Sequence, residues 1–419
     1  MEEIMKILGL ITEYNPFHLG HKYHLEQSLK ITKATHSIAI MSSSFVQRGE
    51  PALVDKWTRA KMAIDNGVDL VIELPFVFSV QSAELFAYGS VKILDSLNLV
   101  DCISFGSENG GLINLIKAAE ILVNEPIEFK NKLKENLNHG MAFSASRGSA
   151  LDYYIKSHSS NDDCDYINLL KESNNILGIE YLKALIKIKS PIIPFSIGRL
   201  GNKYKDEEIT TPIGSATGIR NRLYSSSISS VKEFMPVSSY EYLLDFYNNY
   251  GIFNKLSNYN EILRYILRIK SPKELRGIMD MEEGLENRIL RMSLKHYNLQ
   301  ELVDEVTTKR YPSTRIKRII IHLLMNLKRD EIKRIYGLPI EYIRVLGCNK
   351  KGLEILQRIN KTTEISIITK YSNFRKLRNQ NINSFLEYEE KATDLFFLGI
   401  SKNEPYEKMD YITSPYIAE

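Results

Sequence analysis

The 419-residue chain contains little cysteine: its three cysteines, Cys102, Cys164 and Cys348, lie far apart and form no C-x-x-C pair. This spacing excludes a paired-cysteine zinc or redox motif, so we expect ordinary reduced thiols. No segment offers about eighteen uncharged apolar residues in a row, and the first residues lack the basic-then-apolar pattern of a secretory signal. These absences argue against a membrane or secreted protein, and we expect a cytoplasmic one.

The chain also lacks a strong charge of either sign. Its formal net charge is +4, with 25% charged and 43% hydrophobic residues, which is close to the average of globular proteins. Net charge therefore does not by itself predict nucleic-acid binding. Neither a Walker A loop nor a G-x-G-x-x-G loop follows any apolar run, and there is no internal repeat, so the sequence does not support a P-loop or Rossmann cofactor site.

Apolar runs of strand length alternate with amphipathic stretches through the first two hundred residues. The expected strands are 5–11, 37–41, 70–74, 102–105 and 192–197, and the expected helices are 21–30, 54–66, 83–97 and a longer helical region over about 114–189. Such alternation predicts an α/β fold with a doubly wound parallel sheet. In this fold ligands bind at the carboxyl ends of the strands, where the strand order reverses.

The second half of the chain has a mainly helical pattern. It begins beyond a serine-rich stretch at 225–230, and the length of the chain also predicts more than one domain. We therefore predict an α/β domain over 1–228 and a mainly α-helical region over 229–419. A further break is expected near 337–339, followed by a basic helical region around 350–358 and a polar tail.

Residues 9–21, GLITEYNPFHLGH, join an apolar strand to a helix through a loop that holds two histidines around a glycine. His18 and His21 are expected at the start of the helix, where free N–H groups and the helix dipole favour an anion, and Gly20 allows close approach. Imidazole N–H groups there can stabilise charge that develops as an α-phosphorus is attacked. Two alternatives stay open: a structural role for both rings and, with His24, a zinc site, although no carboxylate or cysteine companion is evident.

Residues 214–220, GSATGIR, form the second candidate phosphate-binding segment. If Thr217 opens a helix over 219–224, its hydroxyl, the nearby N–H groups and the Arg220 guanidinium face one anion, which suits a departing pyrophosphate. The alternative is an ordinary helix N-cap followed by an exposed arginine, because Ser and Thr favour helix starts whatever the function.

The two motifs, in this order, resemble those of the H-x-G-H nucleotidyltransferase superfamily. The second motif usually has the form I-S-S-T-x-I-R, and Gly214 departs from it at the first position. Four further segments resemble the bacterial tRNA(Met) cytidine acetate ligase family: FVQRGEPA at 45–52, KWTRA at 56–60, FGSEN at 105–109 and NNILG at 174–178. The resemblance covers most of the chain. It implies that 1–228 is an ATP-binding, nucleotidyltransferase-like catalytic domain and that the mainly helical region over 229–419 binds tRNA.

The resemblance also implies the reaction and its partners. Acetate would be activated by ATP as acetyl-adenylate, and the acetyl group would pass to the exocyclic amine of the wobble cytidine of elongator tRNA(Met). Acetate cannot acylate an amine directly, because oxide would have to be the leaving group. The carboxylate must therefore be activated first. Positioning the weakly nucleophilic amine against the mixed anhydride would supply much of the second step. Mg²⁺ is expected as the usual companion of ATP, although no ligand for it is evident.

Specific residues are assigned to the expected ATP site. His18 and His21 are the expected catalytic residues, and Ser215, Thr217 and Arg220 are expected to hold the leaving pyrophosphate. The resemblance further implies nucleotide contacts by Gly106, Asn175 and Arg199, with a helix N-cap as the alternative for Asn175 and a solvated surface as the alternative for Arg199. The full expected ATP-binding set is Ile11, Thr12, Glu13, Tyr14, Asn15, Pro16, Phe17, His18, Leu19, Gly20, His21, His24, Gly106, Asn175, Arg199, Ser215, Thr217 and Arg220.

Two basic segments are candidate tRNA contacts. One surrounds the Gly-Glu-Pro turn at 49–51, and the other, at 308–318, is the densest basic stretch and contains an aromatic ring. Lys and Arg neutralise phosphates, and an exposed ring can stack on an unpaired base. An ordinary solvated surface is the alternative for each residue. The candidate tRNA-binding residues are Arg48, Lys56, Arg59, Lys309, Arg310, Arg315 and Arg318.

Two rival functions remain open at this stage. One is an adenylyltransferase that leaves AMP on a mononucleotide or coenzyme precursor, and the other is a tRNA-binding protein that has lost catalysis. The sequence does not show which residue removes the proton of the amine or how the anticodon is selected. It also does not show how larger carboxylates are excluded, or the oligomeric state.

Overall fold

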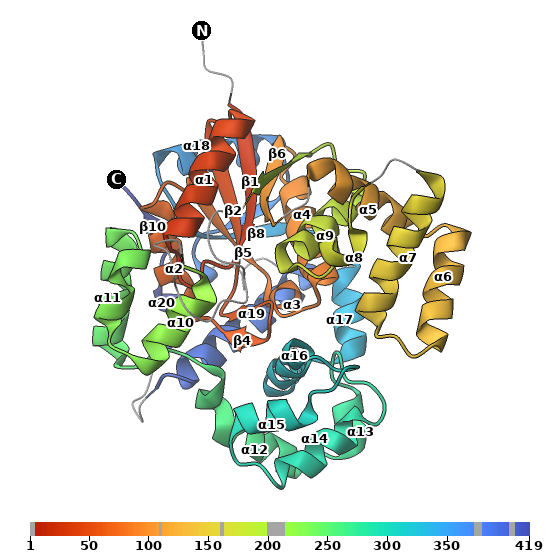
Figure 1. Ribbon diagram of the computed structural model, residues 1–419. Helices are drawn as coiled ribbons and strands as arrows, with labels where there is room; N and C mark the ends of the chain where they lie inside the picture. The colour runs from red at the N-terminus through yellow and green to blue at the C-terminus, as the bar shows by residue number, and fades with distance from the viewer. Residues whose placement is uncertain (1–4, 109–110, 160–162, 199–213, 373–378, 402–406) are drawn as a thin grey trace.

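The computed structural model describes residues 5–108, 111–159, 163–198, 214–372, 379–401 and 407–419. Its centre is an eight-stranded sheet with the order β10-β8-β5-β2-β1-β6-β7, in which β9 also pairs with β8 (Figure 1). The strands are β1 Ile7–Thr12, β2 His36–Ser42, β5 Leu70–Leu74, β6 Cys102–Ser107, β7 Ile193–Gly198, β8 Tyr342–Cys348, β9 Ser366–Ile368 and β10 Tyr416–Ile417; β3 Phe45–Val46 and β4 Glu50–Pro51 form a separate hairpin.

The five expected strands are confirmed as β1, β2, β5, β6 and β7, and they pair in parallel. Every residue of β2 and β5 is buried, as expected for strands covered on both faces. The chain runs from β1 outward to β2 and β5, then returns to the other side of β1 for β6 and β7. The strand order therefore reverses at β1, which is where a doubly wound sheet forms its ligand crevice.

Helices surround the sheet and also form two peripheral groups, α5–α8 and α12–α16 (Figure 1). In the first half they are α1 Leu19–Thr32, α2 Lys56–Ile64, α3 Phe76–Ser79, α4 Ala83–Ser96, α5 Leu112–Asn124, α6 Ile127–Asn138, α7 Phe143–His158, α8 Tyr166–Leu169 and α9 Ser173–Ile188. Then follow α10 Ala216–Ser225, η1 Ile228–Phe234, α11 Val237–Tyr250, η2 Leu256–Tyr259, α12 Asn260–Ile269, α13 Pro272–Arg276, α14 Leu285–Ser293, α15 Leu299–Val306, α16 Ser313–Leu324, α17 Arg329–Tyr336, α18 Lys350–Thr362, α19 Gln380–Leu398 and α20 Met409–Ile412.

Neighbouring residues of β6 show that α1 and α9 cover opposite faces of the sheet. The Ser28 hydroxyl of α1 donates a hydrogen bond to the Ser104 hydroxyl at 2.8 Å. The next residue, Phe105, packs against Gly178 of α9 so closely that a Cβ there would lie 2.6 Å from its ring. Because successive side chains of a strand point to opposite faces, the two helices enclose the sheet from both sides.

The second half of the chain is mainly helical, as expected, but it also supplies strands to the central sheet. β8 pairs antiparallel with β5, so the sheet is mixed rather than purely parallel. α18 confirms the basic helical region, whereas the expected polar tail contains α19, in which many side chains are buried. The division at 228/229 stays a prediction, and the sheet contains strands from both sides of it.

Four buried charges join the two halves of the chain in a closed ring. Lys56 Nζ of α2 lies 2.8 Å from Glu73 of β5 and 2.9 Å from Asp410 of α20, and Arg344 of β8 lies 3.4 Å from Glu73 and 2.6 Å from Asp410. Burial alone would raise the pKa of the Asp410 carboxyl, but Arg344 and Lys56 outweigh it and hold that pKa below its usual value. The pKa of Glu389 is raised well above its usual value by burial and by Glu73, so this neighbouring acid stays neutral. Two cations therefore face two anions.

The hairpin formed by β3 and β4 packs tightly against α16. Gly49, at its turn, has a φ of 79°, and a Cβ built there would lie 2.2 Å from the backbone nitrogen of Arg318. Since backbone atoms of a helix cannot move aside as a flexible side chain can, only glycine fits. The helical second half is thereby fixed against the loop that follows β2.

We expect Gly49→Ala to destabilise the protein more than Gly140→Ala. Gly140 has a similar φ of 81° but no atom within 4 Å of a built Cβ, so its substitution measures backbone strain alone. That strain costs about 1–2 kcal/mol, and the overlap at Gly49 adds about 1–3 kcal/mol. Denaturant unfolding of both variants measures the difference, and equal losses would contradict the tight packing of the hairpin on α16.

Candidate active site

A cavity of about 550 Å³ lies at the carboxyl ends of β1, β6 and β7, where the sheet order reverses. It confirms the crevice expected of a doubly wound sheet. The loops after these strands, the 45–51 hairpin, and the first turns of α1, α9, α10 and α16 form its walls. Its lining residues are Ile11, Thr12, Glu13, Tyr14, Asn15, His18, Gly20, His21, Tyr23, His24, Val46, Gln47, Arg48, Glu50, Ala83, Phe86, Ser104, Phe105, Gly106, Ser173, Asn174, Ile176, Leu177, Tyr181, Ile197, Gly198, Gly214, Ser215, Ala216, Arg220, Thr314 and Arg318.

His18 and His21 together cap the first turn of α1. His18 is the N-cap residue and its Nδ1 accepts from the Gly20 N–H at 3.0 Å, while Nδ1 of His21 accepts from the His18 N–H at 3.3 Å. The two rings stack with their centroids 3.8 Å apart. Both histidines therefore have a structural role as helix caps, which was one of the alternatives for this pair. Both also line the cavity.

The capping contacts determine which ring nitrogen carries the proton. Because Nδ1 accepts a hydrogen bond in both His18 and His21, a neutral imidazole in either position has its proton on Nε2. Each ring is thus a fixed N–H donor without first becoming an imidazolium. Such preorganised donors suit an oxygen that gains negative charge during a reaction.

The Ser215–Arg220 segment lies beside the histidine motif. Ser215 is the N-cap of α10, and its hydroxyl accepts from the Gly218 N–H at 3.1 Å. Arg220 Nη1 donates to the Asn15 carbonyl at 2.8 Å, and its Nη2 donates to Thr217 Oγ1 at 3.2 Å. One guanidinium therefore connects the start of α10 to the loop after β1, and both helix starts border one cavity. Helix starts of this kind bind phosphates.

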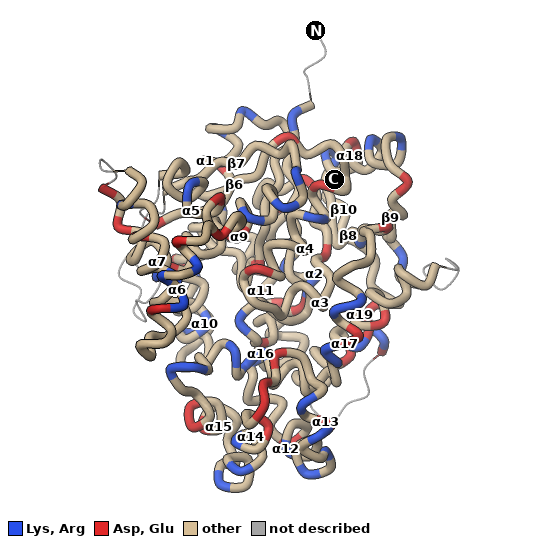
Figure 2. The backbone as a smooth tube through the Cα atoms, turned by 90° about the vertical axis from the view of Figure 1, so that its right-hand side faces the viewer, with Lys and Arg blue, Asp and Glu red and all other residues tan. Residues whose placement is uncertain are grey.

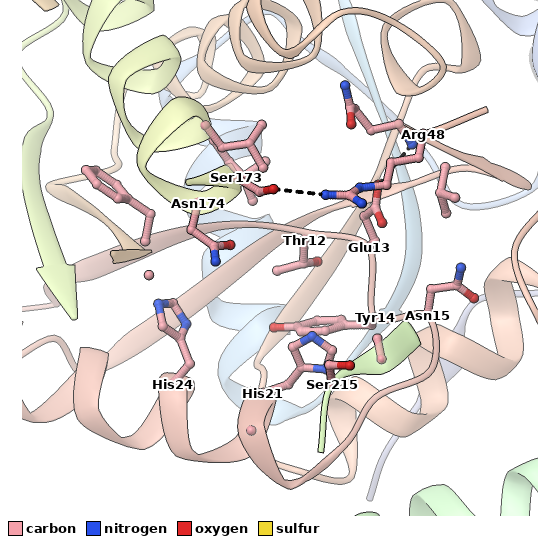
Figure 3. A pocket seen from close by; sticks show the side chains of 18 of the residues that line it. Thr12, Glu13, Tyr14, Asn15, His21, His24, Arg48, Ser173, Asn174 and Ser215 are labelled. Atoms are coloured by element: carbon pink, nitrogen blue, oxygen red, sulfur yellow. Dashed lines mark hydrogen bonds between the residues drawn. The ribbon is translucent and has the colours of Figure 1, made fainter. Parts of the chain in front are cut away.

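The 45–51 hairpin forms another wall of the cavity. The Gln47 N–H donates to Glu13 Oε1 at 2.9 Å, and Arg48 Nη2 donates to the Ser173 hydroxyl at 3.2 Å. Figure 3 shows Glu13 and Arg48 on one side of the cavity, with His24 on the other and His21 and Ser215 below. The cavity thus has a separate polar side away from His24.

Most of the expected ATP-binding residues meet at this cavity. Those that line it are Ile11, Thr12, Glu13, Tyr14, Asn15, His18, Gly20, His21, His24, Gly106, Ser215 and Arg220. Pro16, Phe17, Leu19, Asn175 and Thr217 are not lining residues, and Arg199 lies outside the described residues. A place in the wall does not establish binding, so the ATP contacts stay predictions.

Asn175 and Thr217 have structural contacts instead of places in the cavity wall. Asn175 is fully buried, and its Oδ1 accepts from the Ser107 hydroxyl at 2.8 Å and from the Glu108 N–H at 3.1 Å. It stabilises the end of β6 through this oxygen, and its expected ATP contact stays a prediction. The helix containing Thr217 begins at Ala216, earlier than expected, because Ser215 is its cap.

The sequence interpretation missed several residues of the cavity wall. Asn174 and Gln47 stand in segments that resemble the ligase family, so a signal was present. Tyr181 and Thr314 lie on helices whose cavity-facing side no sequence pattern marks, since that side is defined only when distant elements pack. Burial raises the pKa of Tyr181, which therefore stays protonated.

Two of the candidate tRNA-binding residues cannot reach an RNA. Lys56 and Arg59 have no exposed surface. Lys56 belongs to the buried ring of charges, and Arg59 donates to the carbonyl oxygens of Glu13, at 2.8 Å, and Ser43. Their expected role as RNA contacts is corrected to a structural one, because their partners come from distant parts of the chain.

The basic stretch at 308–318 is largely neutralised by acids. Arg310 and Arg315 pair with Glu282 at 3.1 and 2.7 Å, and Arg318 pairs with Asp280 at 3.3 Å. Figure 2 shows acidic residues beside basic ones around α16 and α17. Lys309 is exposed, and Arg48 and Arg318 line the cavity. The RNA contacts of these five residues stay predictions.

Among the described residues there is no group of three or more His, Cys, Asp or Glu side chains that could hold a metal ion. No helix in the described ranges is long and apolar enough to cross a membrane.

Comparison with known proteins places this architecture in a family. The model of the HIGH Nucleotidyl Transferase family matches residues 5–410. The tRNA(Met) cytidine acetate ligase of Thermoanaerobacter sp. strain X514 is 46% identical over 97% of this chain and 98% of its own length. The protein of that name from Clostridium perfringens strain ATCC 13124 is 43% identical over 99% and 100%. The chain belongs to the tRNA(Met) cytidine acetate ligase family.

Solved structures agree with this assignment. The crystal structure of Thermotoga maritima TmcAL (apo, form I) superimposes with a TM-score of 0.93 at 33% identity and 99% coverage of both chains. The same protein bound with alpha-thio ATP gives a TM-score of 0.91 at 33% identity and the same coverage. The resemblance drawn from the sequence motifs and the predicted nucleotidyltransferase fold are therefore confirmed.

Proposed function

We propose that this member of the tRNA(Met) cytidine acetate ligase family activates acetate with ATP and transfers the acetyl group to the wobble cytidine of elongator tRNA(Met). The observation that carries the proposal is that His18 and His21, whose Nδ1 atoms accept backbone N–H groups, line one cavity with Ser215 and Arg220. Because the proposed substrate is a tRNA, we expect the reaction in the cytoplasm.

The first half-reaction occurs at the α-phosphorus of ATP. An acetate oxygen attacks the α-phosphorus and the bond to pyrophosphate breaks, which leaves acetyl-adenylate. His18 and His21 donate to α-phosphate oxygens as charge builds on them. Ser215 caps the helix whose free N–H groups favour the departing pyrophosphate, and Arg220 supplies the positive charge beside it.

We propose that Mg²⁺ binds together with ATP and not at a separate site of the protein. The carboxylates among the lining residues are Glu13 and Glu50. Glu50 pairs with Lys317 at 2.6 Å and lies 3.8 Å from Arg220. These contacts do not make a ligand set, so triphosphate oxygens and water would hold the ion.

The test separates the ligase from both rivals. The protein is incubated with ATP and labelled acetate, with and without elongator tRNA(Met). The products are separated and identified by mass spectrometry. Acetyl-adenylate without tRNA, and an acetyl group on the wobble cytidine with it, support the ligase. Consumption of ATP by a mononucleotide acceptor without acetyl-adenylate favours the adenylyltransferase, and tRNA binding without either reaction favours the non-catalytic protein.

We expect Arg48→Ala to weaken tRNA binding and to reduce its salt dependence. If Arg48 contacts one phosphate of the anticodon loop, its loss lowers the slope of log K against log salt by about 0.7. Titration of tRNA at several salt concentrations measures this slope. Lys130→Ala is the control, because Lys130 lies on α6, outside the cavity, in an exposed pair with Glu125. An unchanged slope in Arg48→Ala would count against the contact.

A further inference from the structure

The second half-reaction needs a group that accepts a proton from the cytidine amine. We propose that the carboxylate of Glu13 hydrogen-bonds this amine and receives its proton as the acetyl group is transferred. The inference rests on the proposed function and adds a role in acetyl transfer to the ATP contact expected of Glu13.

Glu13 directly follows β1 and faces the polar side of the cavity. One of its oxygens, Oε1, accepts from the Gln47 N–H at 2.9 Å, which fixes the direction of the carboxylate. The other oxygen makes no hydrogen bond or ion pair with a residue that the structure describes. Figure 3 shows Glu13 beside Arg48 and across the cavity from His24. A carboxylate held by one oxygen presents the other as an oriented acceptor.

The main chain beside Glu13 is also fixed. Its carbonyl oxygen accepts from Arg59 Nη1 at 2.8 Å, and Arg59 is fully buried. The adjacent hairpin is anchored by Gly49 against α16, so Gln47 stays in place. A proton acceptor is effective only when it lies within hydrogen-bond reach of the reacting atom, and this double support gives Glu13 a defined position.

Five other ionisable groups of the cavity are poorly suited to accept the proton, and a sixth, His24, lies across the cavity from Glu13 (Figure 3). Burial alone would raise the pKa of Glu50, but Arg220, Lys317 and Arg48 outweigh it and lower that pKa, which makes Glu50 a weak proton acceptor. His18 and His21 use Nδ1 to accept backbone N–H groups and therefore present N–H donors. Burial raises the pKa of Tyr14 and of Tyr181, so both phenols stay protonated.

The transfer step balances with Glu13 as the acceptor. The cytidine N4 lone pair attacks the acetyl carbonyl carbon of acetyl-adenylate and forms the N–C bond. The bond from that carbon to the phosphate oxygen breaks, and AMP leaves with the electron pair. One N4 proton passes to the free oxygen of Glu13, and a water later removes it. No oxidant, reductant or further reactant is needed.

The test measures the two half-reactions separately in Glu13→Gln. The amide keeps an oxygen for the Gln47 N–H but cannot take up the proton. Acetate-dependent ATP–pyrophosphate exchange measures the first half-reaction and shows whether the variant is folded. Because Glu13 also belongs to the expected ATP-binding set, exchange is expected to fall, but by much less than acetyl transfer. Single-turnover transfer from enzyme-bound acetyl-adenylate at saturating tRNA is expected to fall by about 10²–10⁴-fold, the usual contribution of a positioned acid or base.

Two further variants sharpen the result. Glu13→Asp keeps a carboxylate on a shorter arm and is expected to restore part of the transfer rate. Glu50→Gln removes the other cavity carboxylate and is not expected to slow transfer selectively. The inference is overturned if Glu13→Gln transfers at the unmodified rate, if it loses both half-reactions together, or if Glu50→Gln alone shows the selective loss. If the unmodified protein makes no acetyl-adenylate, the proposed function itself fails, and that outcome is distinct.

Discussion

Replacing His21 with asparagine is expected to lower acetate-dependent ATP–pyrophosphate exchange by about 10²–10³-fold, the usual loss when one preorganised donor to a developing oxyanion is removed. Asparagine retains an oxygen that can accept the His18 N–H, so the start of α1 keeps its cap. The Nε2–H donor disappears. Because the donor matters most when charge develops on the phosphate, the loss is expected in kcat more than in the affinity for ATP.

His18→Asn makes the complementary test on the other ring. Its side-chain oxygen can accept the Gly20 N–H that His18 Nδ1 accepts now, so its exchange rate is expected to fall by a similar factor without unfolding. His296→Asn is the control, since His296 lies outside the cavity and pairs with Glu301 at 3.6 Å. Full activity in both cavity variants would show that the histidines only cap the helix.

Removing one member of the buried ring of charges is expected to destabilise the protein by about 3–5 kcal/mol, because the opposite charge is left uncompensated in the interior. Lys56→Met leaves Glu73 and Asp410 facing Arg344 alone, and Asp410→Asn leaves two cations facing Glu73. The free energy of unfolding in denaturant measures each loss.

A double variant isolates the interaction within the ring. Lys56→Met with Asp410→Asn restores equal numbers of cations and anions, so its loss is expected to be smaller than the sum of the single losses. Lys130→Met breaks an exposed pair, with side chains that are 54% and 50% accessible, and is expected to cost about 1 kcal/mol or less. Additive losses in the double variant would mean that Lys56 and Asp410 do not act as a pair.

The parallel part of the fold could be predicted because its signals are local. Each of the five expected strands is a short apolar run, and the intervening helices have their own periodicity. β8 was missed because Arg344 interrupts its apolar run, and the acids that neutralise this arginine are far away in the sequence. The same reason explains why Lys56 was wrongly predicted to contact RNA. No residue near it in the sequence shows that its partners are Glu73 and Asp410.

In the candidate site, too, the sequence predicted the residues of local motifs and missed those that only packing brings together. His18, His21, Ser215 and Arg220 belong to short motifs that cap helices, so their relation to an anion follows from local geometry. Tyr181 and Thr314 enter the cavity wall only through the packing of α9 and α16. The sequence therefore indicated the phosphate side of the cavity and left most of the wall opposite it unidentified.

The antiparallel pairing of β8 with β5 has a consequence for truncation. β5 would be the outer strand if the sheet were built only from the first half of the chain. A fragment that stops near residue 228 would then present a row of unsatisfied N–H and C=O groups along β5, a strand that is apolar except for Glu73, and such an edge is a template for joining other chains. Such a fragment is prone to aggregate, because its missing outer border is made by residues that are synthesised more than a hundred positions later.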